Sequence, residues 1–223
     1  MLYLVTMEKT AKIKVLVILA VAFILFRSAL PVSSLSFELN RLAVSVSIVC
    51  IVFHEFLHAA GAVANHVSLR NISFHYNFEK GFASCRIYTP VKRRGMIQIL
   101  VLPSAVLIMG SLVTYLISKN NVWLAVAFLN LLGGTVDYLA AAILLKLPSD
   151  CDVYEARDRG IGWVLLTSQE MDPLRMASSI WTVQQGNEDS IARDPEKSTV
   201  SIVSIGILFL AILDLAQNAA ALF

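Results

Sequence analysis

The sequence predicts an all-α membrane protein, a bundle of about five transmembrane helices with a small cytoplasmic β-hairpin between the second and third helices. Three observations predict this fold class. Of the 223 residues, 57% are hydrophobic and only 15% are charged, whereas soluble domains carry about 25% charged residues. Five stretches are long and apolar enough to cross a bilayer, which takes about 20 residues. The Lys and Arg residues gather on one side of these stretches.

The same composition excludes several other classes of protein. The net charge is only +2, which gives no general reason to expect a nucleic-acid partner. The three cysteines are scattered without a pairing pattern, so the chain is not a small secreted domain held by disulfides. A mean hydropathy of +0.70 also excludes a disordered chain. The expected surroundings are therefore a lipid bilayer.

The predicted helices cover residues 13–35, 41–66, 95–118, 122–147 and 199–222. Three lysines precede the first apolar run, as they do in a signal peptide, but we favour a retained anchor because the apolar character continues past Arg27. Fifteen of the 18 Lys and Arg residues fall at the N-terminus and in the two longer connections. The positive-inside rule makes those parts cytoplasmic, so a multi-pass integral membrane protein is expected.

Both longer connections show features of folded segments. Residues 69–90 alternate apolar and polar side chains around a Glu-Lys-Gly turn, a pattern typical of a β-hairpin. Residues 148–198 form a polar segment with ten acidic and five basic residues and one strand-like run at 162–167. No repeat divides the chain, and residues 1–223 are expected to form a single integral-membrane domain.

The second predicted helix contains the sequence His54-Glu55-Phe-Leu-His58. Side chains four apart lie on one face of a helix, so the two imidazoles are placed to bind one Zn²⁺ while Glu55 reaches a water as general base. The alternative is that these groups only form hydrogen bonds between helices. A glutamate is costly within an apolar helix, which favours the functional interpretation.

A catalytic zinc usually takes three protein ligands, and the helix supplies two. His66 lies near the helix end and His75 in the hairpin. At about 1.5 Å per residue, His58 and Asp137 lie about 12 and 13 Å from the cytoplasmic surface, and Asp214 about 22 Å. Asp137 is therefore the predicted third ligand. A polar group at a helix contact is the alternative for Asp137, and the favoured interpretation for Asp214.

Asn130 lies seven residues before Asp137 and hence on the same helix face. Its amide is predicted to contact a substrate carbonyl or a ligand carboxylate, and packing between helices explains it equally well. Gly133 and Gly134 stand between the two polar residues. Glycines allow membrane helices to approach closely, as the second and fourth helices must if they share an ion.

With these residues the chain resembles the putative zincin peptidase family, small membrane metalloproteases with the HExxH motif that are distantly related to the site-2 proteases. The resemblance rests on that motif, on the Gly-Gly-x-x-Asp segment ending at Asp137, and on the polar run at 147–155. It implies that the two histidines and the aspartate bind zinc and that the glutamate activates water. The Asn-Pro-Asp-Gly pattern of site-2 proteases is absent, since Tyr138 follows Asp137.

The expected function is that of a zinc-dependent intramembrane metalloprotease. It would hydrolyse peptide bonds of membrane proteins or peptides near the cytoplasmic side, with Zn²⁺ as cofactor. A membrane metal-binding or transport protein could use the same cluster of His54, His58 and Asp137 without hydrolysis. A scaffold without metal is the third alternative.

Overall fold

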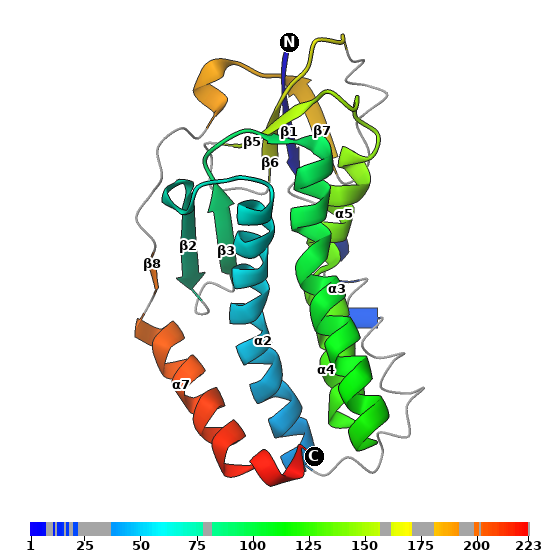
Figure 1. The fold of residues 1–223 in the computed structure, drawn as a ribbon, viewed down its shortest axis with the longest axis vertical. Helices are drawn as coiled ribbons and strands as arrows, with labels where there is room; N and C mark the ends of the chain where they lie inside the picture. Colours follow the sequence, from blue (N-terminus) through cyan, green and yellow to red (C-terminus); the bar gives the residue numbers. More distant parts are fainter. Residues whose placement is uncertain are drawn as a thin grey trace.

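The structure is a computed structural model. It describes residues 1–7, 11, 13–15, 17, 20–21, 37–77, 82–156, 162–170, 181–191, 199–200 and 202–222. Most of the first predicted helix, at 13–35, lies outside the described residues. Figure 1 shows that the described helices run along the long axis of the molecule, with β-strands gathered at one end and along one side.

The prediction of an all-α bundle is wrong, because two sheets accompany the helices. The larger sheet has five strands in the order β4-β5-β6-β1-β7, and the paired strands run antiparallel. Its strands are β1 (Leu2–Met7), β4 (Val91–Lys92), β5 (Asp152–Glu155), β6 (Gly162–Leu166) and β7 (Trp181–Gln185). Three of these five strands, β5, β6 and β7, come from the described residues of the polar segment at 148–198.

The N-terminal strand β1 was the least expected element. Its residues are alternately buried and half-buried, with Tyr3, Val5 and Met7 directed inward. Its partners β6 and β7 lie about 160 to 180 residues away in the chain. One hydrophobic core joins this sheet to the ends of the helices, since Val5 and Leu165 cluster with Leu144. The sheet thus closes one end of the helical part.

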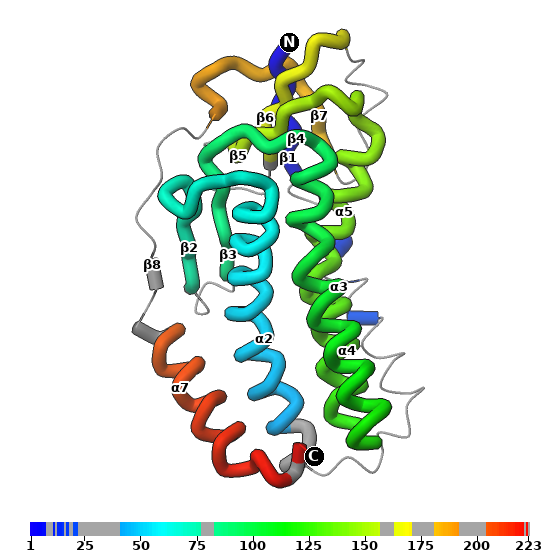
Figure 2. Tube along the Cα trace, viewed as in Figure 1, coloured from blue at the N-terminus to red at the C-terminus, as the bar shows by residue number. Residues whose placement is uncertain are grey.

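The helices are α2 (Phe37–Ala64), α3 (Arg93–Ser118), α4 (Val122–Gly133), α5 (Thr135–Leu144) and α7 (Ile202–Gln217). Helix α2 packs against α3, α4 and α7 and against a strand of the smaller sheet, which makes it central among the described helices. Figure 2 shows that the N-terminus lies at the sheet end and the C-terminus at the other end, beside the start of α2. There the Trp123 indole donates to the carbonyl of Leu222.

The predicted helix at 122–147 is two helices, α4 and α5, which are bent by 45° at Gly134. A Cβ at Gly134 would clash with the Ser104 hydroxyl of α3, whereas a Cβ at Gly133 would meet nothing within 4 Å. The close approach therefore involves one glycine only. It brings the α4–α5 break against α3 rather than against α2.

The smaller sheet contains the hairpin predicted over residues 69–90. Strands β2 (Ile72–Asn77) and β3 (Phe82–Ile87) pair antiparallel, and β8 (Thr199–Val200) joins β2 in parallel. The hairpin lies alongside α2 rather than beyond its end (Figure 1). The ring of Phe74 lies 5.2 Å from that of Phe56, and the Tyr76 hydroxyl donates to the Val52 carbonyl at 3.5 Å. Strand β2 is therefore level with the HExxH motif.

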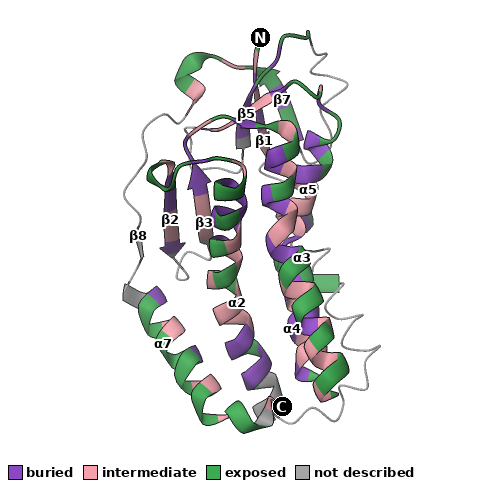
Figure 3. Ribbon diagram, viewed as in Figure 1, coloured by how far each residue is buried: buried purple, intermediate pink, exposed green. Residues whose placement is uncertain are grey.

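Among the described residues, two helices are long and apolar enough to span a membrane, Arg41–Ala64 and Arg93–Ser118. The bent pair α4–α5 makes a third if it counts as one span, and α7 is shorter. The expected five spans are thus corrected to two or three in the described part of the chain. Figure 3 shows that most of α7 is exposed. The exposed large apolar residues of the helices include Phe53, Met109, Ile117 and Phe209.

Candidate metal centre

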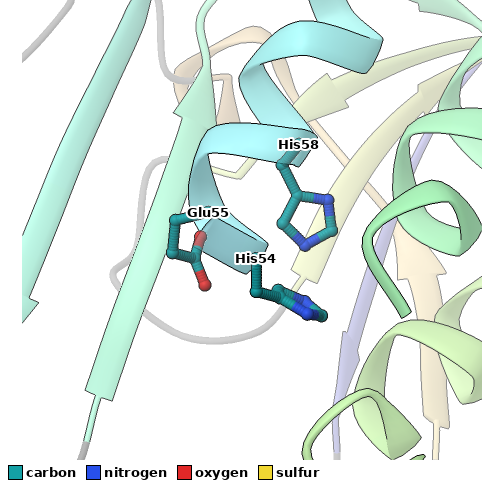
Figure 4. A group of neighbouring side chains, drawn as sticks. All are labelled: His54, Glu55 and His58. Carbon is teal, nitrogen blue, oxygen red and sulfur yellow. The ribbon is translucent and has the colours of Figure 1, made fainter. Parts of the chain in front are cut away.

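One turn of α2 carries His54, Glu55 and His58. The two imidazole rings lie 4.7 Å apart between centroids and meet edge to face. Glu55 is only 7% exposed and His58 only 8%. One potential ligand atom of each of the three residues lies within 4.8 Å of the others. Figure 4 shows the two imidazoles directed toward α3 and α5, with Glu55 on the side of α2 that faces the hairpin.

Asp137 meets both imidazoles from the first turn of α5. Its Oδ2 lies 2.9 Å from His54 Nε2 and 3.5 Å from His58 Nε2. Ligands bound tetrahedrally at about 2.1 Å from a zinc ion are separated by roughly 3.4 Å. The three side chains therefore converge at separations that fit one Zn²⁺. The structure brings together the two histidines and the aspartate that the sequence predicted.

The contact of the other ring nitrogen of His58, Nδ1, determines which of its two nitrogens carries the proton. Nδ1 lies 2.8 Å from the carbonyl oxygen of Ile99 in α3. A backbone carbonyl only accepts hydrogen bonds, so Nδ1 carries the proton and Nε2 presents its lone pair toward Asp137. Two acceptors that face each other at 3.5 Å require a proton or a cation between them. This arrangement, in which the outer nitrogen is anchored to a carbonyl, is typical of metal-binding histidines.

Glu55 lies next to the two imidazoles, on the face of α2 that is turned toward the hairpin. The backbone N–H of Cys85 in β3 lies near the Glu55 carboxylate and faces it as a potential donor. Strand β3 packs against α2 and is an edge strand of its sheet. A carboxylate that is oriented by a backbone donor and adjacent to the imidazoles is suited to accept a proton from a water at the site. The hairpin therefore positions the candidate base.

A largely buried ion pair lies next to the site, and no sequence pattern indicated it. Arg86 Nε of β3 lies 3.8 Å from Glu155 Oε1 of β5. Burial raises the pKa of Glu155 to about 7, although the positive charge of Arg86, and that of His58 when it is protonated, oppose the shift. The pair joins the hairpin to the five-stranded sheet. Because its members are 69 residues apart, no local pattern marks it.

The other predicted residues have different surroundings. The Asn130 amide donates to the Val126 carbonyl at 2.9 Å and lies against the Cys50 thiol, one turn of α2 before His54. Its role in substrate binding stays a prediction. Asp214 forms an ion pair with Arg41 at 2.9 Å.

The two remaining histidines considered as ligands lie elsewhere in the fold. His66 follows α2 in the left-handed region with φ 66° and is exposed. His75 lies in β2, where its Nε2 is 3.1 Å from Ser73 Oγ.

Comparison with known proteins adds one finding. Residues 47–151 match the model of a family described as "putative zincin peptidase". The expected resemblance to this family is thus confirmed over residues 47–151. No curated protein and no solved structure was found to match the chain. The matched residues run from α2 through α5 and include the HExxH motif and Asp137. Zincin peptidases are zinc-dependent, which agrees with the His54-Glu55-His58 group.

Proposed function

We propose that this protein is a zinc-dependent intramembrane peptidase that hydrolyses peptide bonds of membrane-associated substrates near the cytoplasmic side. The observation that supports it is the convergence of His54 Nε2 and His58 Nε2 on one oxygen of Asp137, at 2.9 and 3.5 Å. The donor set of two imidazoles and a carboxylate leaves one tetrahedral position for water or substrate, as in catalytic rather than structural zinc sites.

In this proposal each residue has one task. His54, His58 and Asp137 would hold Zn²⁺, and the ion, when bound, would supply Lewis-acid chemistry by lowering the pKa of water toward about 7 and polarising a carbonyl. Glu55 accepts the proton of the attacking water and delivers it to the leaving amine. The Cys85 amide keeps the Glu55 carboxylate oriented during both transfers. The Ile99 carbonyl keeps His58 in the Nδ1–H tautomer.

The surroundings support an intramembrane location of the reaction. The motif lies in a helix that is long and apolar enough to span a bilayer, and Phe53 and Phe56 on this helix are more than half exposed. The hairpin at the level of the motif supplies an extended backbone beside the site. A peptide bond is cut in an extended conformation. The outer edge of β3, which pairs with no further strand among the described residues, is therefore a suitable place for a substrate segment.

The test is cleavage of fluorogenic transmembrane peptides by the full chain in lipid nanodiscs. Glu55→Gln should lower the rate by about 10² to 10⁴-fold, because the general base is lost, while zinc content stays at the wild-type value. Asp189→Asn, an exposed acid elsewhere, is the control and should change neither quantity. A chelator should abolish wild-type cleavage. Cleavage by Glu55→Gln at the wild-type rate would contradict the proposal, and zinc transport that survives this substitution would favour the transport alternative.

A further inference from the structure

Helix α3 contains a proline in its interior, at position 103. In an α-helix the N–H of each residue donates to the carbonyl four residues earlier. Proline has no N–H and cannot make this bond. The carbonyl that loses its regular partner is that of residue 99, which is the carbonyl that binds His58. The carbonyl oxygen that Pro103 cannot reach as a donor is therefore the one that accepts the hydrogen bond of His58.

This carbonyl lies in the protein interior. Ile99 is 2% exposed, and Pro103 is among the fully buried side chains. A buried carbonyl without a partner is costly, so nearly all such groups are paired. At 2.8 Å, the Nδ1–H of His58 provides the partner that residue 103 cannot. The bond between α2 and α3 thus satisfies two groups that would otherwise both lack a partner.

The two helices approach closely at the same level. Gly61 follows His58 by three residues and lies on the same face of α2. A Cβ at Gly61 would lie only 3.3 Å from the Cα of Ile99 and 3.3 Å from Leu102 Cδ2. Only a glycine lets the backbone of α3 come this near without displacement. The short distance between His58 and the carbonyl therefore depends on the packing of both helices.

We propose that Pro103 is a positioning residue of the metal centre, which reserves the Ile99 carbonyl for His58 and thereby holds Nε2 toward Asp137. This inference rests on the proposed role of His58 as a zinc ligand. Proline is tolerated in membrane helices for several reasons, but a proline at any other position of α3 would release a different carbonyl. The four-residue spacing between Ile99 and Pro103 is what links it to the site.

The experiment compares three residues at position 103 in the full chain: proline, alanine, and lactic acid introduced as a backbone ester. Alanine restores an N–H that competes for the Ile99 carbonyl, whereas lactic acid has the alanine side chain without the N–H. Zn²⁺ affinity is measured by competition with a chromophoric chelator. Alanine should weaken binding about tenfold or more, the range found for partners of ligand histidines. Lactic acid should stay within about twofold of proline.

A second ester measures the general cost of the backbone change. Lactic acid in place of Ala105, an exposed residue of the same helix, should leave Zn²⁺ affinity unchanged. Equal affinities for alanine and lactic acid at position 103, whether both wild-type or both weakened, would overturn the inference. In that case only the ring of Pro103, or nothing at this position, would matter.

A spectroscopic readout separates this inference from the proposed function. The ¹⁵N shifts of His58 in the metal-free protein report which ring nitrogen carries the proton. With proline or lactic acid at position 103, Nδ1 should be protonated, and with alanine the population should move toward the Nε2–H tautomer. An unchanged tautomer with alanine would overturn the inference even if zinc binds. If the wild-type protein binds no zinc while alanine at position 103 still shifts the tautomer, the proposed function is refuted and the role of Pro103 in orienting His58 stands.

Discussion

Two neighbouring faces of helix α2 hold different parts of the site by different means. On one face, His54 and His58 meet Asp137 and the Ile99 carbonyl, all from helices. On the neighbouring face, which is turned toward the hairpin, Glu55 lies near the Cys85 amide of an edge strand. The ligands are thus fixed by close helix packing and the base by a hairpin. Metal binding and proton transfer should therefore respond to different substitutions.

The largest expected effect is on the helical side. Asp137→Asn replaces a charged ligand by a neutral amide while nearly preserving its shape. Zinc sites with four protein ligands gain about 10–16 kcal/mol on binding, or roughly 3 kcal/mol per ligand. At 1.4 kcal/mol per factor of ten, we expect Zn²⁺ affinity to fall about 100-fold, measured by chelator competition. Glu55→Gln is the matched comparison on the neighbouring face of α2. An Asp137→Asn affinity within a factor of three of wild type would show that another group completes the site.

A smaller effect, on the pH dependence of folding stability, is expected when Glu155 next to the five-stranded sheet is substituted. Its pKa in the folded protein, about 7, lies above its ordinary value of 4.5. The folded state therefore binds more protons than the unfolded state between these pH values. The resulting stabilisation is complete below pH 4.5 and is lost as the pH rises through 7, up to about 3 kcal/mol across this window.

The measurement is thermal unfolding of the metal-free protein at several pH values. Between pH 5 and 8, the stability of the Glu155→Gln variant should fall less steeply than that of the wild type. Zn²⁺ affinity at fixed pH should change by less than about threefold, because Glu155 lies with Arg86 on the sheet side. Parallel pH profiles for the two proteins would show that Glu155 does not titrate in this range.

The smallest expected effect is on the unfolding temperature, and it is measured by substituting the two neighbouring glycines at the α4–α5 break. Gly134→Ala places a Cβ 3.0 Å from Ser104 Cβ and still closer to its hydroxyl, whereas Gly133→Ala meets nothing within 4 Å. Overpacking of this kind costs about 1–3 kcal/mol. Gly134→Ala should therefore lower the unfolding temperature and weaken zinc binding through Asp137, while Gly133→Ala should do neither. Equal unfolding temperatures for the two variants would show that the α4–α5 break does not need glycine.

Those parts of the site that depend on local spacing, or on the depth of a residue in the bilayer, could be predicted from the sequence. The i, i+4 spacing of His54 and His58 fixes their common face, and counting residues from the surface placed Asp137 at the same level. The Ile99 carbonyl could not be predicted in the same way, because backbone atoms leave no residue type to recognise. Pro103, within the charge-free stretch 95–118, was the available signal.

The fold was predicted less completely, for physical reasons that individual elements show. Strand β1 is a short apolar run whose period is ambiguous by itself, and its pairing with Val164 and Val183 depends on distant sequence. The break at Gly134 depends on its contact with Ser104 in another helix. Apolar composition indicates helices that cross a bilayer, but it does not show which polar segments pair with one another.

X-ray absorption at the zinc edge of the purified full chain tests the metal centre most directly. We expect one zinc per chain, with two imidazole nitrogens at about 2.0–2.1 Å and only nitrogen or oxygen atoms in the first shell. Asp137→Asn should change this first shell, and Glu55→Gln should leave it as it is. A sulfur ligand at about 2.3 Å, or a spectrum without two imidazoles, would contradict a centre built from His54, His58 and Asp137.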